Sequence, residues 1–377
     1  MKKLLIAGAV ALTAVAFAQD GKSLTGAGAS FPFPLYQEMF AQYNKTSGVQ
    51  VNYQSVGSGA GRTQIIAQTV DFGASDAFMT DELLKTAPGA IVHVPMAIGA
   101  VVPVYNVPGA PDKMKFTGDV LAQIYLGKIT KWNDAKITKL NMGVKLPDLA
   151  ITPVYRSDGS GTTAIFVDYL SKVSSDWAGT VSKGPQSTVK WPVGVGGPQS
   201  AGVAGLVKQT SGAIGYVETV YAKANKLEYG VVRNSTGKFV DGGNLKEVAL
   251  ASDSKSLPND TRVSFTNSDI GYPISGFTWI LVYKEQKYGN RTAAQAQSLV
   301  DLLKWMLADG QKINEQLSYG QIDGSALTKA KKIVSSITTV AKRCNSRASK
   351  IHPRETISRG CFHFHDIPLT IAPHAWA

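Results

Sequence analysis

The segment ITPVYRSDGSGTTAIFVDYL, residues 151–170, passes from a strand pattern through a polar turn into a helix pattern. Residues 151–155 form an apolar, strand-like run, and the Gly/Ser-rich turn begins at Arg156. Beyond the turn, Phe166, Leu170 and Val173 recur at the spacing of one helix face. The segment therefore predicts a strand, a tight turn and a helix in direct succession.

The rest of the chain repeats this alternation. Residues 51–56 are strand-like and precede a predicted helix that contains Ile65, Ile66 and Val70. Residues 277–283 predict a buried strand, followed by an amphipathic helix from about residue 292 to residue 307. Strand-like runs that alternate with helix patterns indicate an α/β protein with largely parallel sheets.

Length and composition limit the classes of protein to consider. The chain has 377 residues, a formal net charge of +12 and 44% hydrophobic residues, which is typical of a core-forming protein. Single hydrophobic cores stop growing at roughly 250 to 300 residues, so two domains are expected. The composition excludes a collagen, a coiled coil and a wholly disordered chain, and two cysteines cannot form a disulfide scaffold.

The first residues have the features of a cleavable secretory signal. Lys2 and Lys3 precede an uncharged stretch over residues 4–17, and the sequence AFA at residues 16–18 supplies a small-x-small cleavage pattern. This stretch is shorter than the about 20 residues that a membrane-spanning helix needs, so a retained anchor is the less favoured alternative. We expect a signal peptide over residues 1–18 and a mature protein that is periplasmic or otherwise extracytoplasmic.

A second uncharged stretch covers residues 87–110. It contains four prolines together with His93 and Asn106, which would disrupt a helix exposed to lipid. We interpret the stretch as buried strands, with a membrane span as the alternative.

Three Gly/Ser-rich turns precede predicted helices, at residues 26–32, 57–62 and 156–163. Each would place hydroxyl groups and unpaired backbone N–H groups at a helix N-terminus, where an anion is favoured. Taken singly, each turn is better explained as an ordinary helix cap or tight turn. Neither the P-loop nor the dinucleotide-binding spacing is present, which argues against a nucleotide site.

Two further groups favour an oxyanion. Arg156 can hold a tetrahedral oxyanion through two parallel hydrogen bonds, and Asp158 can fix its guanidinium; a surface ion pair is the alternative. Asp76 follows a short apolar stretch at a predicted strand end, although it could equally cap the helix that contains Glu82.

Seven ordered stretches carry a resemblance to a known family. They are LTGAGASFP at 24–32, VNYQ at 51–54 with GS at 57–58, VDFGASD at 70–76, YLGKI at 125–129, DGSGT at 158–162, TVKWP at 188–192 and GAIGYVE at 212–218. Over residues 24–319 the chain resembles the periplasmic phosphate-binding proteins of Pst-type phosphate ABC transporters.

The resemblance implies the type II periplasmic binding protein fold, in which two α/β domains are joined by two crossing strands with the ligand cleft between them. Domain 1 would consist of residues 19–97 plus 274–340 and domain 2 of residues 98–273, with crossings near Ile98 and Ile274. The expected function is capture of inorganic phosphate and its delivery to membrane permease subunits by a monomer that uses no cofactor.

The same matching implies the site residues. Phosphate would be held by hydroxyl, guanidinium and backbone donors, with one carboxylate acceptor and one carboxylate partner for the arginine. These residues are Ser30, Phe31, Ser58, Asp76, Arg156, Asp158, Ser160, Gly161 and Thr162. Phosphate near neutral pH keeps a proton that Asp76 can accept, whereas sulfate has none, so the carboxylate would discriminate against sulfate.

Other classes of function are weaker alternatives. A secreted phosphatase would need a base or a metal to activate Ser160, yet His93 is the one histidine before the tail and is expected in the core. We therefore expect no catalytic residue, no metal site and no enzyme, with another oxyanion binder as an alternative. An adhesion protein or a nucleic-acid binder lacks interleaved basic and aromatic residues, so no nucleic-acid partner is expected.

The C-terminal residues 341–377 depart from the family pattern. They hold both cysteines and four of the five histidines. The spacing of Cys361, His363 and His365 matches no standard zinc site, and a disulfide between Cys344 and Cys361 is the other alternative. We expect an unrelated, poorly ordered extension.

Overall fold

The computed structural model describes residues 21–253 and 255–339. The predicted signal peptide at residues 1–18 lies outside the described residues. The predictions for residues 341–377, including those for Cys344 and Cys361, lie outside them as well.

The centre of the described chain is a nine-stranded sheet in the order β2-β1-β3-β12-β4-β8-β6-β7, with β9 paired to β4. Its strands are β1 (Ser23–Gly28), β2 (Gln50–Ser55), β3 (Phe72–Ser75), β4 (Ile91–Tyr105), β6 (Thr152–Arg156), β7 (Val195–Gly197), β8 (Ala213–Glu218), β9 (Glu228–Tyr229) and β12 (Ser275–Tyr283). A three-stranded sheet contains β5 (Lys115–Phe116), β10 (Val231–Arg233) and β11 (Phe239–Val240).

The large sheet is parallel towards its two ends and antiparallel in the middle. Strand β1 runs parallel to β2 and β3, and β6 runs parallel to β7 and β8. Strands β4 and β12 are antiparallel to each other, β12 is antiparallel to β3, and β4 is antiparallel to β8. The expectation of largely parallel sheets therefore holds for the ends and is wrong for the centre, where the two strands return in opposite directions.

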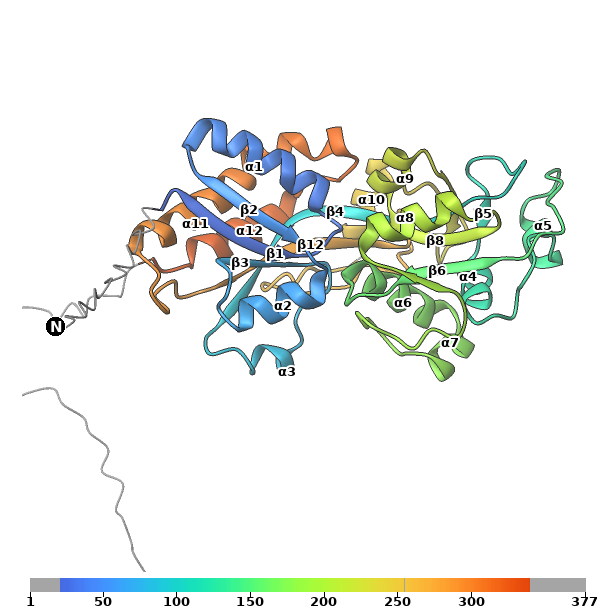
Figure 1. Ribbon diagram of the computed structural model, residues 1–377, viewed down its shortest axis with the longest axis horizontal. Coiled ribbons are helices and arrows are strands. Elements are labelled where there is room, and N and C mark those ends of the chain that lie inside the picture. Colours follow the sequence, from blue (N-terminus) through green and yellow to red (C-terminus); the bar gives the residue numbers. More distant parts are fainter. Residues whose placement is uncertain (1–20, 254, 340–377) are drawn as a thin grey trace, which may run out of the picture. The chain divides into compact units, whose positions relative to one another are not determined.

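Strand β4 belongs to both ends of the sheet. Its register with β12 runs from Ile91 to Ala100, and from Val101 onwards its partner is β8. The Val101 N–H donates to the carbonyl of Ile274 (2.9 Å) just before β12 begins. Figure 1 shows β4 and β12 lying between the blue and orange segments on one side and the green ones on the other. The crossing strands thus lie within a few residues of Ile98 and Ile274.

Helices flank the strands of the large sheet. They are α1 (Phe33–Ser47), α2 (Ser58–Ile66), α3 (Asp81–Leu84), α4 (Gly118–Tyr125), α5 (Ala135–Leu140), α6 (Gly161–Val173), α7 (Ser175–Thr180), α8 (Gln199–Gln209), α9 (Thr219–Asn225), α10 (Leu245–Asp253), α11 (Ala293–Met306) and α12 (Gly324–Ser335), with 3-10 turns at Asp309–Ile313 and Glu315–Leu317. The alternation of strand and helix agrees with the predicted α/β class.

The helix ends follow from local chemistry. Thr292 and Gln295 form a capping box that fixes the start of α11 one residue after the predicted start. Helix α6 contains Phe166 and Leu170, both buried, as predicted. Helix α2 ends at Ile66, so the inclusion of Val70 in that helix was wrong; the chain turns there to enter β3.

Within the uncharged stretch at residues 87–110, residues 91–105 form β4, which is buried along nearly its whole length. His93 lies in this strand and is 3% exposed, and its Nε2 accepts a hydrogen bond from the Met79 N–H (2.9 Å). Burial lowers the pKa of His93 to about 3, so the imidazole is neutral and belongs to the core, as expected. Within the described residues, none of the helices has the length and apolar character to span a bilayer.

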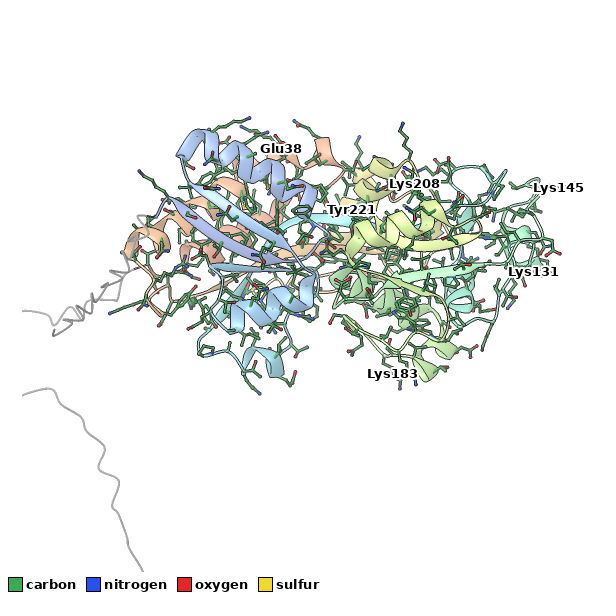
Figure 2. All side chains as sticks on the ribbon, in the orientation of Figure 1. Glu38, Lys131, Lys145, Lys183, Lys208 and Tyr221 are labelled. Carbon is green, nitrogen blue, oxygen red and sulfur yellow. The ribbon has the colours of Figure 1, made fainter. Side chains whose placement is uncertain are left out.

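Several lysine side chains of the described chain point into solvent. Lys131, Lys145, Lys183 and Lys208 are exposed and are labelled in Figure 2, where they project from different elements rather than from one face.

Candidate functional site

The three Gly/Ser-rich turns, which follow the C-terminal ends of β1, β2 and β6, meet in the structure. The Gly57 N–H donates to the carbonyl of Gly28 (2.8 Å), which joins the second turn to the end of β1. The Gly59 N–H donates to the carbonyl of Gly159 (2.8 Å), which joins the second turn to the third. Turns that are far apart in the sequence therefore form one continuous structure.

Gly161 allows the start of α6 to approach β3 and α2. A Cβ atom at this position would lie 2.6 Å from the Cβ and Oδ2 atoms of Asp76 and 2.6 Å from the Oγ atom of Ser58. A larger residue would therefore fit only if the side chains of Asp76 and Ser58 moved. Because Gly161 and Thr162 are the first two residues of α6, their N–H groups have no acceptor within the helix and point out of its N-terminus.

Arg156 is a buried cation held by a two-pronged ion pair. Its Nε atom donates to Asp158 Oδ1 (2.8 Å) and its Nη2 atom to Asp158 Oδ2 (2.5 Å). The side chain of Arg156 is 1% exposed and that of Asp158 is 22% exposed. Burial alone would raise the pKa of Asp158, but the bonds and charge of Arg156 outweigh it and hold the pKa below its usual value. The alternative of a surface ion pair is therefore wrong.

The remaining guanidinium nitrogen of Arg156 reaches a cluster of hydroxyl groups. Its Nη1 atom donates to Thr162 Oγ1 (3.3 Å) and to Ser200 Oγ (3.2 Å). Ser200 Oγ lies 3.1 Å from Ser30 Oγ, and the Ser200 N–H also donates to Ser30 Oγ (3.2 Å). All four residues are buried, so hydroxyls from α1's preceding turn, α6 and α8 converge on one guanidinium.

Asp76 supplies a hydrogen-bond acceptor beside these donor groups. It is 3% exposed, its Oδ2 accepts from Ser58 Oγ (3.2 Å), and its Oδ1 has no hydrogen-bond partner among the described residues. Burial raises the pKa of Asp76 to about 7; the charge of Glu218 adds to the rise, whereas the hydroxyls of Thr278 and Ser58 and the charge of Arg156 oppose it. The alternative role as a helix cap is wrong, because the Thr80 side chain caps α3.

Ser160 and Phe31 complete the predicted set. Ser160 Oγ accepts from the Thr163 N–H (3.0 Å) and so caps α6, which leaves the hydroxyl proton able to donate elsewhere. The Phe31 side chain is fully buried, and its carbonyl accepts from the Tyr319 hydroxyl (2.5 Å). The structure thus brings all nine predicted residues into one buried neighbourhood.

Two residues of this neighbourhood were missed. Ser200 stands near the start of α8 after the sequence GGPQS, residues 196–200, a turn of the same kind as the three that were considered. Glu218 ends β8 and is 1% exposed, and its Oε1 accepts from Thr162 Oγ1 (2.5 Å). Its position at the end of a buried strand was the available signal.

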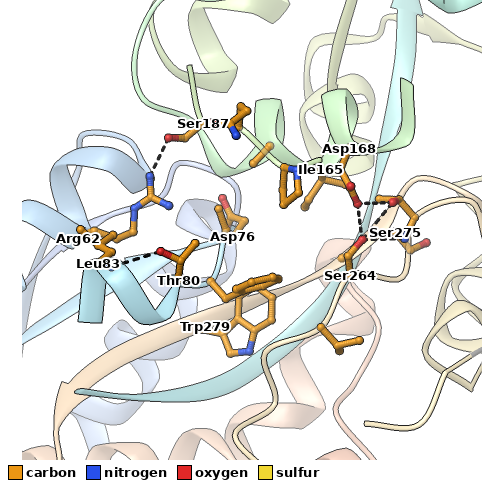
Figure 3. Close-up of a pocket in the computed structure, with 18 residues that line it drawn as sticks. Arg62, Asp76, Thr80, Leu83, Ile165, Asp168, Ser187, Ser264, Ser275 and Trp279 are labelled. Atoms are coloured by element: carbon orange, nitrogen blue, oxygen red, sulfur yellow. Dashed lines mark hydrogen bonds between the residues drawn. The ribbon is translucent and has the colours of Figure 1, made fainter. Parts of the chain in front are cut away.

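A pocket of about 210 Å³ adjoins the cluster at Asp76. Trp279, Phe78 and Ile165 supply apolar walls. Arg62 lines the pocket as well, and its Nη2 atom donates to Ser187 Oγ (2.7 Å). Figure 3 shows this bond and the position of Asp76 among the lining side chains. Asp76 therefore lies between the hydroxyl cluster on one side and this partly apolar pocket on the other.

The described residues offer no group of three or more His, Cys, Asp or Glu side chains placed to hold a metal ion. What the neighbourhood presents is a buried guanidinium, several hydroxyls, the N-terminus of α6 and two carboxylates that burial drives towards protonation. This donor set suits a tetrahedral oxyanion that carries a proton.

Comparison with known proteins places the chain in a sequence family. A family model described as "PBP superfamily domain" matches residues 13–309. The chain is 42% identical over 315 residues to the phosphate-binding protein PstS of Pasteurella multocida, covering 82% of this chain and 89% of the relative. It is 44% identical over 300 residues to PstS of Xylella fastidiosa strain 9a5c, with 78% of this chain and 80% of the relative covered.

Solved structures show the same fold. The phosphate-binding protein from Stenotrophomonas maltophilia superposes with a TM-score of 0.65 at 18% identity, covering 82% of this chain and 93% of that one. At this identity the likeness concerns the fold alone. It confirms the predicted fold class, with α/β lobes joined by two crossing strands.

Proposed function

Because the chain belongs to the PstS phosphate-binding proteins of the PBP superfamily, we propose that it captures inorganic phosphate outside the cytoplasm and delivers it to an ABC transporter. The observation that carries the proposal is the Arg156–Asp158 pair, in which the buried guanidinium also donates from Nη1 to a cluster of hydroxyl groups. The permease subunits of the transporter are the proposed partners, and the protein acts as a monomer.

The proposed ligand is surrounded by donors. Arg156, the hydroxyls of Ser30, Ser58, Ser160 and Thr162, and the N–H groups of Phe31, Gly161 and Thr162 donate to the phosphate oxygens, and Asp158 holds the guanidinium in place. Charge-assisted hydrogen bonds contribute roughly 1.5 to 3 kcal/mol each, so several together can offset the cost of burying an anion. Without such a set of donors, the site could not bury an anion.

Asp76 provides the discrimination. Its Oδ1 atom is buried and without a partner among the described residues, which supports a role as acceptor for the proton that phosphate retains. Sulfate has no proton to offer, so it would place its lone pairs against those of the carboxylate. An unmade bond and a repulsion at the same atom favour phosphate.

Capture requires the site to close. We propose domain 1 over residues 19–97 plus 274–340 and domain 2 over residues 98–273, with β4 and β12 as the connection. Contacts between the two support closure around the ligand: the Arg62 to Ser187 bond, the Gly59 to Gly159 bond, and the Tyr221 hydroxyl, labelled in Figure 2, which donates to the Ser30 carbonyl (2.7 Å). Binding and closure are then one equilibrium.

The proposed function is binding without catalysis. His93 is neutral, and its Nε2 atom is occupied by the Met79 N–H, so it cannot activate Ser160. The relatives carry the name of binding proteins. A phosphomonoester assay on protein freed of phosphate is expected to show no turnover, and measurable turnover would support the phosphatase alternative.

Titration calorimetry on residues 19–377 tests the proposal. Phosphate is expected to bind far more tightly than sulfate, with arsenate, which has the same charge and a similar shape, close to phosphate. Arg156→Ala should weaken binding of all three oxyanions together by at least about 100-fold, because the site loses its cation and the Asp158 carboxylate is left without its partner. Unchanged phosphate binding in this variant would remove Arg156 from the site.

A further inference from the structure

Glu218 is a second buried carboxylate beside the proposed phosphate site. It ends β8, is 1% exposed, and lies across Thr162 from Arg156. Its Oε1 accepts from Thr162 Oγ1 (2.5 Å), and its Oε2 has no hydrogen-bond partner among the described residues. The discrimination by Asp76 does not use this carboxylate.

The bond between Thr162 and Glu218 decides what the threonine hydroxyl can do. A hydroxyl group carries one proton. Thr162 Oγ1 accepts from Arg156 Nη1 and gives its proton to Glu218 Oε1. While Glu218 is a carboxylate, Thr162 therefore has no proton left to donate to a bound anion.

A proton on Glu218 reverses this bond. The carboxyl O–H then donates to Thr162 Oγ1, and the threonine proton becomes available to the ligand. The proton comes from solvent, and no other bond is made or broken. The change turns Thr162 from an acceptor that faces the anion into a donor.

The surrounding charges favour the protonated form when an anion enters. Arg156 on β6 already forms an ion pair with Asp158, so its positive charge is divided between Asp158 and Glu218. Asp76, after β3, adds a second negative charge near Glu218. The hydroxyls of Tyr221 on α9 and of Tyr319 also face Glu218. Burial raises the pKa of Glu218, although its bond to Thr162 and the charge of Arg156 oppose the rise. A phosphate anion beside Thr162 would raise it further.

We propose that Glu218 is a positioning residue that carries a proton in the phosphate complex and thereby turns the Thr162 hydroxyl towards the ligand. The inference rests on the proposed function, since it assigns a role within the phosphate site. It predicts that phosphate affinity depends on pH through Glu218 in addition to the ionisation of phosphate itself.

The test compares the pH dependence of phosphate binding in the wild type and in Glu218→Gln. Glutamine keeps the shape, can donate permanently to Thr162, and does not titrate. As the pH rises, wild-type affinity should fall more steeply than that of the variant, with a difference of up to about tenfold per pH unit. The control Glu285→Gln changes an exposed glutamate and should keep the wild-type slope.

The outcomes separate the two proposals. If the wild type fails to bind phosphate, the proposed function is wrong. Proton uptake on binding is measured by calorimetry in buffers of different ionisation enthalpy. If the wild type binds phosphate and Glu218→Gln shows the same pH slope and the same proton uptake as the wild type, the proposed role of Glu218 is wrong. A structural role alone would lower affinity equally at every pH.

A second measurement applies if Glu218→Gln does not fold. The phosphate complex of Asp76→Asn, which lacks the other carboxylate that titrates beside the cluster, should show the infrared carbonyl band of a protonated carboxyl group at neutral pH. The band should shift in heavy water. Its absence in a phosphate-bound sample would overturn the proposal.

Discussion

Asp76→Asn is the substitution that tests anion selection most directly. It replaces one carboxylate oxygen by an NH₂ group and leaves the volume of the side chain unchanged. The side chain is 3% exposed, and Oδ2 accepts from Ser58 Oγ at 3.2 Å, so the amide oxygen can keep that bond. The NH₂ group then occupies the position of Oδ1, which has no partner among the described residues.

The structure allows the size of the effect to be worked out. Phosphate loses an acceptor for its proton but gains a donor to another of its oxygens, so its affinity should fall by no more than about tenfold. For sulfate, the substitution replaces a repulsive carboxylate oxygen by an NH₂ group that donates a hydrogen bond. A hydrogen bond to a charged group contributes roughly 1.5 to 3 kcal/mol, which corresponds to about 10- to 150-fold tighter sulfate binding. The preference for phosphate should therefore fall by at least about 10-fold and by up to about 1,500-fold.

Competition titrations of phosphate against sulfate measure this ratio in both proteins at pH 8, above the pKa of Asp76. Asp119→Asn, an exposed change of the same kind on α4, serves as the control. An unchanged ratio in Asp76→Asn would remove Asp76 from the role of discriminator. A loss of phosphate affinity as large as the loss of selectivity would indicate a general role in binding instead.

Three further outcomes follow from the same geometry. Gly161→Ala should weaken phosphate binding by at least about tenfold in calorimetry, because the added Cβ would overlap Asp76 and Ser58. Gly205 has open space around it, so the control Gly205→Ala should bind phosphate as the wild type does. Equal affinities of the two variants would contradict this packing. The preference of the wild type for phosphate over sulfate should fall as pH drops below about 7, because a protonated Asp76 can donate to sulfate; a ratio that is constant across this range in competition titrations would refute it. Without phosphate, the raised pKa of Asp76 lowers the stability of the wild type as the pH rises from the pKa of the unfolded chain towards that of the folded protein. The free energy of unfolding of Asp76→Asn should therefore exceed that of the wild type by up to about 4 kcal/mol above pH 7 and by little below pH 4. Denaturant titrations that give equal stabilities at both pH values would exclude a buried, destabilising carboxylate.

The sequence predicts the strand–turn–helix units well because each is encoded locally. In residues 151–170, the apolar run, the Gly/Ser turn and the spacing of Phe166 and Leu170 all lie within one stretch, and the structure forms β6 and α6 there. The direction of the central strands is not local. It depends on β12, more than 170 residues after β4, returning beside it.

The site was predictable to the extent that its residues lie in the turns. Ser30, Ser58 and the residues from Arg156 to Thr162 share one kind of turn, and the family resemblance brought them together. Ser200 and Glu218 escaped because nothing near them in the sequence indicates that Arg156 and Thr162 are their neighbours. Burial also decides the chemistry of Asp76, since the residue type alone predicts an ordinary carboxylate.

The sharing of β4 has a consequence for cooperativity. Nine of its residues between Ile91 and Ala100 pair with β12, and the last five pair with β8. If either end of the sheet melts, the other loses a strand partner and exposes an unpaired edge. The two halves should thus denature together in a single calorimetric transition.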